Sequence, residues 1–332
     1  MSIIVLKKKS GTPKYKQIVG AIEVAIVKGL LKKGDKLPSL NAIKDAHSLS
    51  RDTVLNAFNE LKNRGVIHSI VGKGYYVSNE NVTIKQKIFL LFDELNSFKE
   101  DLYNSFLKKL GDNIQVDIFF HHFNDAIFNK LINDNIGDYN YYVVMPANFQ
   151  NTQEIIQNLP KEKVYILDQI HPDLEAYPAI FQNFEKDVFE GLSLGLSSIR
   201  HYQKLILLFS EEVQPKGILI GFEAFCAQHT IEYEIISTIE NRVLEHGEIY
   251  VVLEDRNLIR IIKKISETQL VLAQDIGIIS YNDTILKEVV ANGITTISTD
   301  FNFMGERLAE MILNNEQVKV ENPSSLILRK SI

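Results

Sequence analysis

Hydrophobic residues recur at helical spacing through the first part of the chain. Ile18, Ile22 and Ile26 lie on one face of a helix predicted to begin near Lys14 and to stop at Gly29. Two shorter helical patterns follow, and a serine precedes each of them. Serine accepts hydrogen bonds from the free amides at a helix N-terminus, so the sequence predicts three helices in this region.

The second helix is predicted to follow Ser39 and to run to about Ala46. The third is predicted to follow Ser50 and to run from Arg51 to about Arg64. Two helices joined by a tight turn form a helix-turn-helix, in which the N-terminal end of the second helix enters the DNA major groove. This segment is therefore interpreted as a DNA reader.

A glycine-rich turn then separates two short apolar runs. Val66–Ile70 and Tyr75–Val77 flank Gly72, Lys73 and Gly74, a pattern that predicts a β-hairpin wing. The lysine at such a tip can approach a phosphate or the minor groove closely, because the neighbouring glycines carry no side chains.

From residue 88 onward, short apolar runs alternate with amphipathic stretches. This alternation predicts an α/β body of parallel sheets flanked by helices. The predicted strands are Ile88–Phe92, Val116–Phe120, Tyr141–Met145, Val164–Leu167, Leu205–Phe209, Ile249–Leu253, Ile276–Ser280 and Ile294–Ser298. The predicted helices include Phe98–Leu110, Asp125–Asn133, Phe189–His201 and Leu258–Ser266.

Charge divides the chain in the same place as the pattern does. The formal net charge is −6, yet residues 1–78 contain 14 Lys and Arg against 5 Asp and Glu, a net of +9 that leaves −15 for the rest. A basic segment beside an acidic one indicates that only the first meets a polyanion. We therefore predict a DNA-binding domain at 1–78, a linker at 79–87 and a body at 88–332.

Composition excludes several classes of protein. No apolar run approaches the roughly 18 residues of a membrane span. The single cysteine, Cys226, excludes a disulfide framework and a cysteine zinc site. Apolar residues precede the N-terminal lysines, the reverse of a secretory signal, so we expect a cytoplasmic protein with no membrane partner.

Polar residues directly follow several predicted strands. Ligands of parallel sheets bind at the carboxyl ends of the strands. Carboxylates and amides accept hydroxyl hydrogen bonds and aromatic rings stack on sugar carbons, so these positions favour a neutral polyol. The positions are Asp93 to Phe98, His121-His122, Asp168-Gln169, Glu254-Asp255 and Tyr281-Asn282-Asp283.

Four motifs in the first domain occur in a fixed order. They are Pro13-x-Tyr15-x-Gln17-Ile18, Gly34-Asp35-x-Leu37-Pro38-Ser39, Leu49-Ser50-Arg51-Asp52-Thr53-Val54 and Gly72-Lys73-Gly74-Tyr75-x-Val77. Their order and spacing resemble the GntR-type winged helix-turn-helix. The resemblance implies DNA contact by Ser39, Asn41, Ser50, Arg51, Asp52, Thr53, Gly72 and Lys73. Asn41 stands where the family often has an arginine, so the guanine preference of an arginine is lost there.

Four further blocks lie near the C-terminus. They are Ile278-Ile279-Ser280-Tyr281-Asn282-Asp283, Ile294-Thr295-Thr296-Ile297, Met304-Gly305-x-x-Leu308-Ala309 and Leu326-Ile327-Leu328-Arg329-x-Ser331. In this order they look like the effector domains of LacI/GalR-type regulators. That resemblance implies a two-lobed periplasmic-binding-protein-like domain, a sugar between its lobes and a homodimer. A GntR-type reader fused to such a body is similar to arabinose-responsive repressors.

The strand-end pattern and this resemblance together imply a set of ligand-binding residues. Leu253-Glu254-Asp255 looks like the family's "A-N-D" sugar contact, although Asp255 could instead cap a helix beginning near Asn257. The family's sugar-binding arginine has no clear counterpart, and Lys216 is the nearest cation. The predicted ligand-binding residues are Asn96, Phe98, Lys99, His121, Asp168, Lys216, Asp255 and Asn282.

Other functions compete with this interpretation. The carboxylates could serve glycoside hydrolysis, which would make the chain a carbohydrate-acting enzyme with a basic accessory module. That alternative leaves the winged domain unexplained. A metal site at His121-His122 is not favoured, because adjacent strand residues point to opposite faces. Cys226 has no marked base near it and is interpreted as a buried hydrophobe.

The favoured hypothesis is a sequence-specific transcription regulator that binds a double-stranded DNA operator as a homodimer. We expect a repressor of carbohydrate-utilisation genes that is released by a small sugar, with a pentose or a 6-deoxyhexose suggested by the resemblance. Catalytic residues, metal ions and cofactors are not expected.

Overall fold

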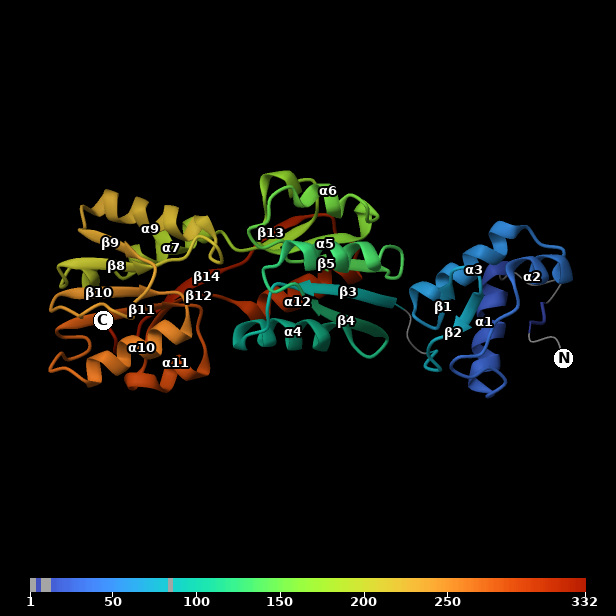
Figure 1. Ribbon diagram of the computed structural model, residues 1–332, viewed down its shortest axis with the longest axis horizontal. Coiled ribbons are helices and arrows are strands. Elements are labelled where there is room, and N and C mark those ends of the chain that lie inside the picture. Colours follow the sequence, from blue (N-terminus) through green and yellow to red (C-terminus); the bar gives the residue numbers. More distant parts are fainter. Residues whose placement is uncertain (1–3, 7–12, 83–85) are drawn as a thin grey trace.

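The computed structural model describes residues 4–6, 13–82 and 86–332. Residues 1–3 and 7–12 of the predicted DNA-binding domain, and 83–85 of the predicted linker, lie outside the described residues. Figure 1 shows a small N-terminal domain at one end of the molecule and two α/β lobes beyond it.

The N-terminal domain has the predicted order of three helices and a hairpin. Its elements are α1 (Lys14–Val27), α2 (Leu40–His47), α3 (Arg51–Asn63), β1 (Ile67–Ile70) and β2 (Gly74–Val77). The apolar faces of the helices meet in one core, whose fully buried residues include Ile18, Ile22, Val54, Phe58 and Leu61. The two strands pair antiparallel and form the predicted wing.

The first lobe, here the N-lobe, contains a six-stranded parallel sheet in the order β13-β7-β6-β5-β3-β4. Alternate residues of β3 enter two different cores, one under α4 and α12 and the other under α5 and α6. The strands are β3 (Gln86–Phe92), β4 (Ile114–Phe120), β5 (Tyr141–Val144), β6 (Val164–Asp168), β7 (Ala179–Phe181) and β13 (Lys319–Glu321). The helices are α4 (Ser97–Leu110), α5 (Asp125–Asp134), α6 (Thr152–Ile156) and α12 (Phe301–Leu313), with 3-10 turns η1 (Lys161–Lys163) and η2 (Pro172–Leu174).

The second lobe, here the C-lobe, contains the sheet β14-β12-β11-β10-β8-β9, in which only the pairing of β14 is antiparallel. Helices α7 and α9 cover one face and α10 covers the other. The strands are β8 (Lys204–Leu208), β9 (Tyr233–Ile236), β10 (Glu248–Val252), β11 (Ile276–Tyr281), β12 (Thr295–Thr299) and β14 (Ser324–Ile327). The helices are α7 (Phe184–Leu194), α8 (Leu196–Ile199), α9 (Lys216–His229), α10 (Asp255–Ser266) and α11 (Ile285–Val289), with the 3-10 turn η3 (Val290–Asn292).

Several boundaries differ from the prediction, and α10, for example, begins at Asp255 instead of Leu258. The sheet begins at Gln86, which pairs with Ile114, so the last two residues of the predicted linker belong to β3. The helix predicted over Phe189–His201 is two helices, because α7 begins earlier and ends at Gly195. The short strands β7, β9, β13 and β14 were not predicted.

Between residues 86 and 332 the chain crosses from lobe to lobe three times, after β7, after β12 and after β13 (Figure 1). Two glycines set how closely the helices of each lobe approach. A Cβ at Gly221 of α9 would lie 2.2 Å from the Glu185 carbonyl oxygen, and one at Gly305 of α12 would lie 2.2 Å from the Leu102 carbonyl oxygen. Both positions therefore require glycine.

Candidate effector cleft and DNA-binding surface

A cavity of about 480 Å³ lies between the two lobes. Its walls include residues at the carboxyl ends of β3 and β6 in the N-lobe and of β10 and β11 in the C-lobe, where a parallel sheet is expected to bind a ligand. The structure brings together six of the eight residues predicted to bind the ligand, namely Asn96, Phe98, Lys99, Asp168, Asp255 and Asn282.

Asp168 is the last residue of β6 and has a left-handed φ of 75°. Its Oδ1 accepts a hydrogen bond from Gln182 Nε2 at 2.6 Å. Tyr281 of the C-lobe donates to Gln182 Oε1 at 3.5 Å, so the three side chains connect the lobes. Burial raises the pKa of Asp168, and the nearby Lys99 ammonium opposes that shift.

Lys99 and Asn96, two of the predicted N-lobe residues, already bond to other groups of the protein. Lys99 forms an ion pair with Asp93, and both side chains are more than nine-tenths buried. Asn96 caps α4, because its Oδ1 accepts a hydrogen bond from the Lys99 amide at 3.2 Å. Phe98 stacks on Phe301 with 4.8 Å between the ring centroids. These residues shape the cleft wall.

The C-lobe wall combines Asp255, Asn282 and Lys287. Asp255 is the first residue of α10, and the N-cap position belongs to Glu254, so the alternative that Asp255 caps this helix is wrong. Asp255 Oδ1 lies 3.0 Å from the Lys287 ammonium. Burial lowers the pKa of Lys287. Asn282 has a φ of 59°, and its Oδ1 is buried without a hydrogen-bond partner among the described residues.

His121 and Lys216 do not line the cavity, in contrast to the prediction. His121 is fully buried, and its Nε2 donates to the Met145 carbonyl oxygen at 3.1 Å. Its ring packs against Phe128 and Phe149, and burial lowers its pKa. Lys216 is the first residue of α9 and is exposed. His121 misses the cavity because the end of its strand faces the core. Lys216 misses it because the start of α9 faces solvent.

Several cavity residues were missed by sequence reasoning. Lys287 lies inside a helix and Gln182 on a crossing segment, so neither follows one of the strands that the pattern predicts. Gln214 precedes α9, and its carbonyl oxygen accepts a hydrogen bond from Asn148 of the N-lobe at 2.9 Å. Asp93, Gln169, Glu254 and Tyr281 also line the cavity, and the strand-end pattern did indicate them.

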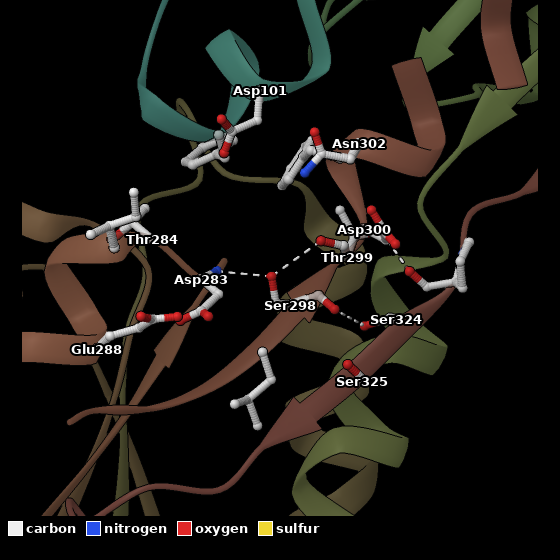
Figure 2. Close-up of a pocket in the computed structure, with 15 residues that line it drawn as sticks. Asp101, Asp283, Thr284, Glu288, Ser298, Thr299, Asp300, Asn302, Ser324 and Ser325 are labelled. Carbon is white, nitrogen blue, oxygen red and sulfur yellow. Dashed lines mark hydrogen bonds between the residues drawn. The ribbon is translucent and has the colours of Figure 1, made fainter. Parts of the chain in front are cut away.

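A second cavity of about 480 Å³ lies beside the crossing segments and shares Phe98 with the first. Figure 2 shows Asp101 and Asn302 on one side of this cavity and Asp283 and Glu288 on another. Many of its polar groups are engaged within the protein. Asp283 forms two hydrogen bonds with Arg329, and Ser298 Oγ accepts from the Asp283 amide at 2.8 Å. These bonds within the protein indicate that the second cavity is a structural gap beside the crossing segments.

The residues predicted to contact DNA lie on the exposed ends of α2 and α3 and on the wing. Ser39 and Ser50 cap these helices by accepting hydrogen bonds from the amides of Ala42 and Thr53 at 3.1 and 3.2 Å. Asn41, Arg51 and Asp52 are exposed beside the caps, and Gly72 and Lys73 are exposed at the wing tip. Arg51 forms no ion pair with any described residue, so its guanidinium is available to a base or a phosphate.

Among the described residues, no helix has the length and apolar character that a membrane span requires. No group of three or more His, Cys, Asp and Glu side chains in these parts of the chain could hold a metal ion.

The N-terminal domain is similar to known regulatory proteins. Residues 14–77 match the model of bacterial regulatory proteins, gntR family. The chain is 30% identical to the HTH-type transcriptional repressor YtrA of Bacillus subtilis (strain 168) over 103 residues, which are 30% of this chain and 79% of YtrA. The chain belongs to the gntR family of bacterial regulatory proteins. It is therefore a DNA-binding transcription regulator, and the predicted family is confirmed.

Another relative is the arabinose metabolism transcriptional repressor of Geobacillus stearothermophilus. It is 37% identical to this chain over 71 residues, which are 21% of this chain and 20% of that protein. The match thus spans about a fifth of that relative's length.

The body of this gntR-family protein resembles a different group. Residues 200–332 match the periplasmic binding protein-like domain. The dimeric Lac repressor with an 11-residue C-terminal deletion is similar in structure, with a TM-score of 0.64 and 14% identity over 74% of this chain and 98% of that chain. The likeness shows the fold and confirms the predicted two-lobed architecture.

Proposed function

We propose that this regulator represses carbohydrate-utilisation genes and that a small uncharged sugar, bound between the lobes, releases it from its operator. The supporting observation is the cavity between the lobes, which combines carboxylate and amide oxygens with aromatic rings. Carboxylate and amide oxygens accept hydrogen bonds from hydroxyl groups, and aromatic rings pack on the C–H face of a sugar.

The free acceptors lie on both lobes. Asp168 on the N-lobe and Asp255 on the C-lobe each have one carboxylate oxygen bonded to a protein group, and the Oδ1 of Asn282 has no partner among the described residues. A ligand that donates hydroxyl hydrogens to both walls is held most strongly when the lobes are close together. The bound form therefore differs from the free form in the angle between the lobes.

A homodimer formed through the body would present two winged domains to an operator with inverted half-sites. A change in the angle between the lobes then changes the separation of the two α3 helices. A ligand shifts such an equilibrium only if it binds the geometry that does not fit the operator more tightly than the one that does.

The test combines a thermal-shift screen with footprinting on the promoter region. L-Arabinose, L-fucose, D-ribose, D-xylose, D-galactose and D-glucose are screened, because a ligand that binds only the folded state raises the melting temperature. We expect at least one of them to raise it and to remove the footprint. If no sugar raises the melting temperature, the proposed effector is wrong, and if aryl glycosides of these sugars are hydrolysed, the chain is an enzyme.

A further inference from the structure

Lys287 is a cation in the wall of the cleft that sequence reasoning did not find. Only 1% of its side chain is exposed. Its Nζ donates to the carbonyl oxygens of Tyr281 and Asn282 at 2.9 and 2.6 Å and lies 3.0 Å from Asp255 Oδ1. An ammonium group has three N–H donors, so these three acceptors use all of them. Lys287 therefore acts on a ligand through the groups that it holds.

These contacts join two loops of the C-lobe. Asp255 follows β10, whereas Tyr281 and Asn282 lie where β11 ends. Asn282 has a left-handed φ of 59°, a conformation that L-residues adopt at some cost. The ammonium bonded to its carbonyl oxygen stabilises this turn, and the turn places the Asn282 side chain in the cavity wall.

The charge of the cleft depends on the same lysine. Asp93 is neutralised by Lys99, and Asp255 is neutralised by Lys287. Among the described residues Asp168 has no ion-pair partner and only the amide of Gln182 bonded to its side chain. Without Lys287, Asp255 would become a further carboxylate without an ion-pair partner in a cavity wall that also contains Glu94, Asp168 and Glu254 and the cation Arg256.

A carboxylate left without its ammonium in the cavity wall would favour a ligand that carries an amine, because a cation would then be held by charge-assisted hydrogen bonds. A carboxylate paired with an ammonium group has no net charge together with it. Such a pair still offers a hydrogen-bond acceptor to a neutral ligand but attracts a cation only weakly. Specificity is the difference between the affinities for these two ligand classes.

Building on the proposed sugar-binding function, we propose that Lys287 determines the charge specificity of the cleft. By neutralising Asp255 and holding the turn at Asn282, it makes the C-lobe wall select an uncharged polyol over a polyol that carries an amine.

The experiment measures affinities of the full-length protein for two probes of matched shape, D-galactose and protonated D-galactosamine, together with the sugars of the screen above. Three variants are compared with the wild type. Lys287→Met removes the ammonium, and Asp255→Asn combined with Lys287→Met removes both charges. Lys216→Met is the matched control, because Lys216 undergoes the same substitution outside the cavity.

In the wild type we expect uncharged sugars to bind more tightly than D-galactosamine. In Lys287→Met we expect the ratio of the two affinities to shift by at least tenfold toward the amine. In the double variant this shift should disappear, and Lys216→Met should behave like the wild type. Circular dichroism verifies that each variant is folded. If Lys287→Met does not fold, the double variant serves as the test, because the double variant contains no unpaired charge at this position.

An unchanged ratio of the affinities for uncharged sugar and D-galactosamine in folded Lys287→Met would overturn the proposal. An equal loss of affinity for both ligands that the double variant does not reverse would also overturn it. If no uncharged sugar binds the wild type, the proposed effector fails while the role of Lys287 is still tested. In that case a gain of D-galactosamine binding in Lys287→Met supports the charge role, and no gain refutes it.

Discussion

Lys62 of α3 forms an ion pair with Asp138 of the N-lobe, with 2.7 Å between Nζ and Oδ1. The same helix carries Arg51 at its other end, on the surface predicted to meet DNA. Next to this contact, Arg64 donates to the Val82 carbonyl oxygen at 2.9 Å. The C-terminal end of α3 is therefore attached to the body, and the N-terminal end is free for DNA.

This contact gives a prediction about coupling between the two halves. Lys62→Ala and Asp138→Ala should each change the inducer concentration that releases the operator by up to about fivefold, because an ion pair at the surface contributes roughly 0–1 kcal/mol. Operator affinity without inducer should change less for Asp138→Ala, which lies on the body. Gel-shift titrations with the inducing sugar measure both quantities, and equal responses in all proteins would show that the contact does not transmit the signal.

Arg51→Ala should abolish specific operator binding. The guanidinium has no ion-pair partner among the described residues, and the base contact of such an arginine is worth about 1–3 kcal/mol in discrimination. Footprinting against unrelated DNA as competitor measures the loss. An unchanged footprint would mean that α3 is not the recognition helix.

Lys73→Ala should weaken binding to all duplexes alike. Lys73 is exposed at the wing tip, where it can neutralise one phosphate. The slope of log affinity against log salt concentration should then fall by about one. A loss confined to the operator sequence would instead indicate that Lys73 reads a base.

Asp255→Ala should abolish sugar binding while operator binding remains. A charged hydrogen bond lost from the ligand costs roughly 1.5–3 kcal/mol, and the variant also leaves the Lys287 ammonium without its carboxylate. Calorimetric titration with the sugar found in the screen is the measurement. Retained affinity in the folded variant would remove Asp255 from the site.

Asp187 should make stability depend on pH. Its side chain is 6% exposed in α7, and burial raises its pKa from 3.8 to about 7. The folded state thus keeps a proton that the unfolded state releases, so this group lowers the free energy of unfolding as pH rises from about 4 to about 7. Asp187→Asn should remove that decrease and raise the melting temperature above pH 7, by an amount corresponding to about 1–4 kcal/mol. Parallel pH-dependent melting curves for both proteins would contradict the assignment.

The sequence by itself determined the three helices and the family of the first domain, several helices of the body and most of the strands. The positions of Ser39 and Ser50 predicted the N-caps of α2 and α3, and alternating apolar runs predicted parallel sheets. Both signals depend on neighbours within a few residues. The strand-end rule also found Asp168, Asp255 and Asn282, since the carboxyl ends of parallel strands meet at one edge.

Only the tertiary structure decided the roles of residues whose partners are distant in sequence. His121 follows a strand as the cavity residues do, and Lys216 was chosen as the cation nearest to the family's arginine, yet the His121 ring lies in the core and Lys216 is exposed to solvent. Lys287 gave no local signal, because its charge matters only where α11 lies beside Asp255 of α10. Packing between elements determines which polar side chains meet. The local sequence pattern does not specify that packing, because it involves residues that are distant along the chain.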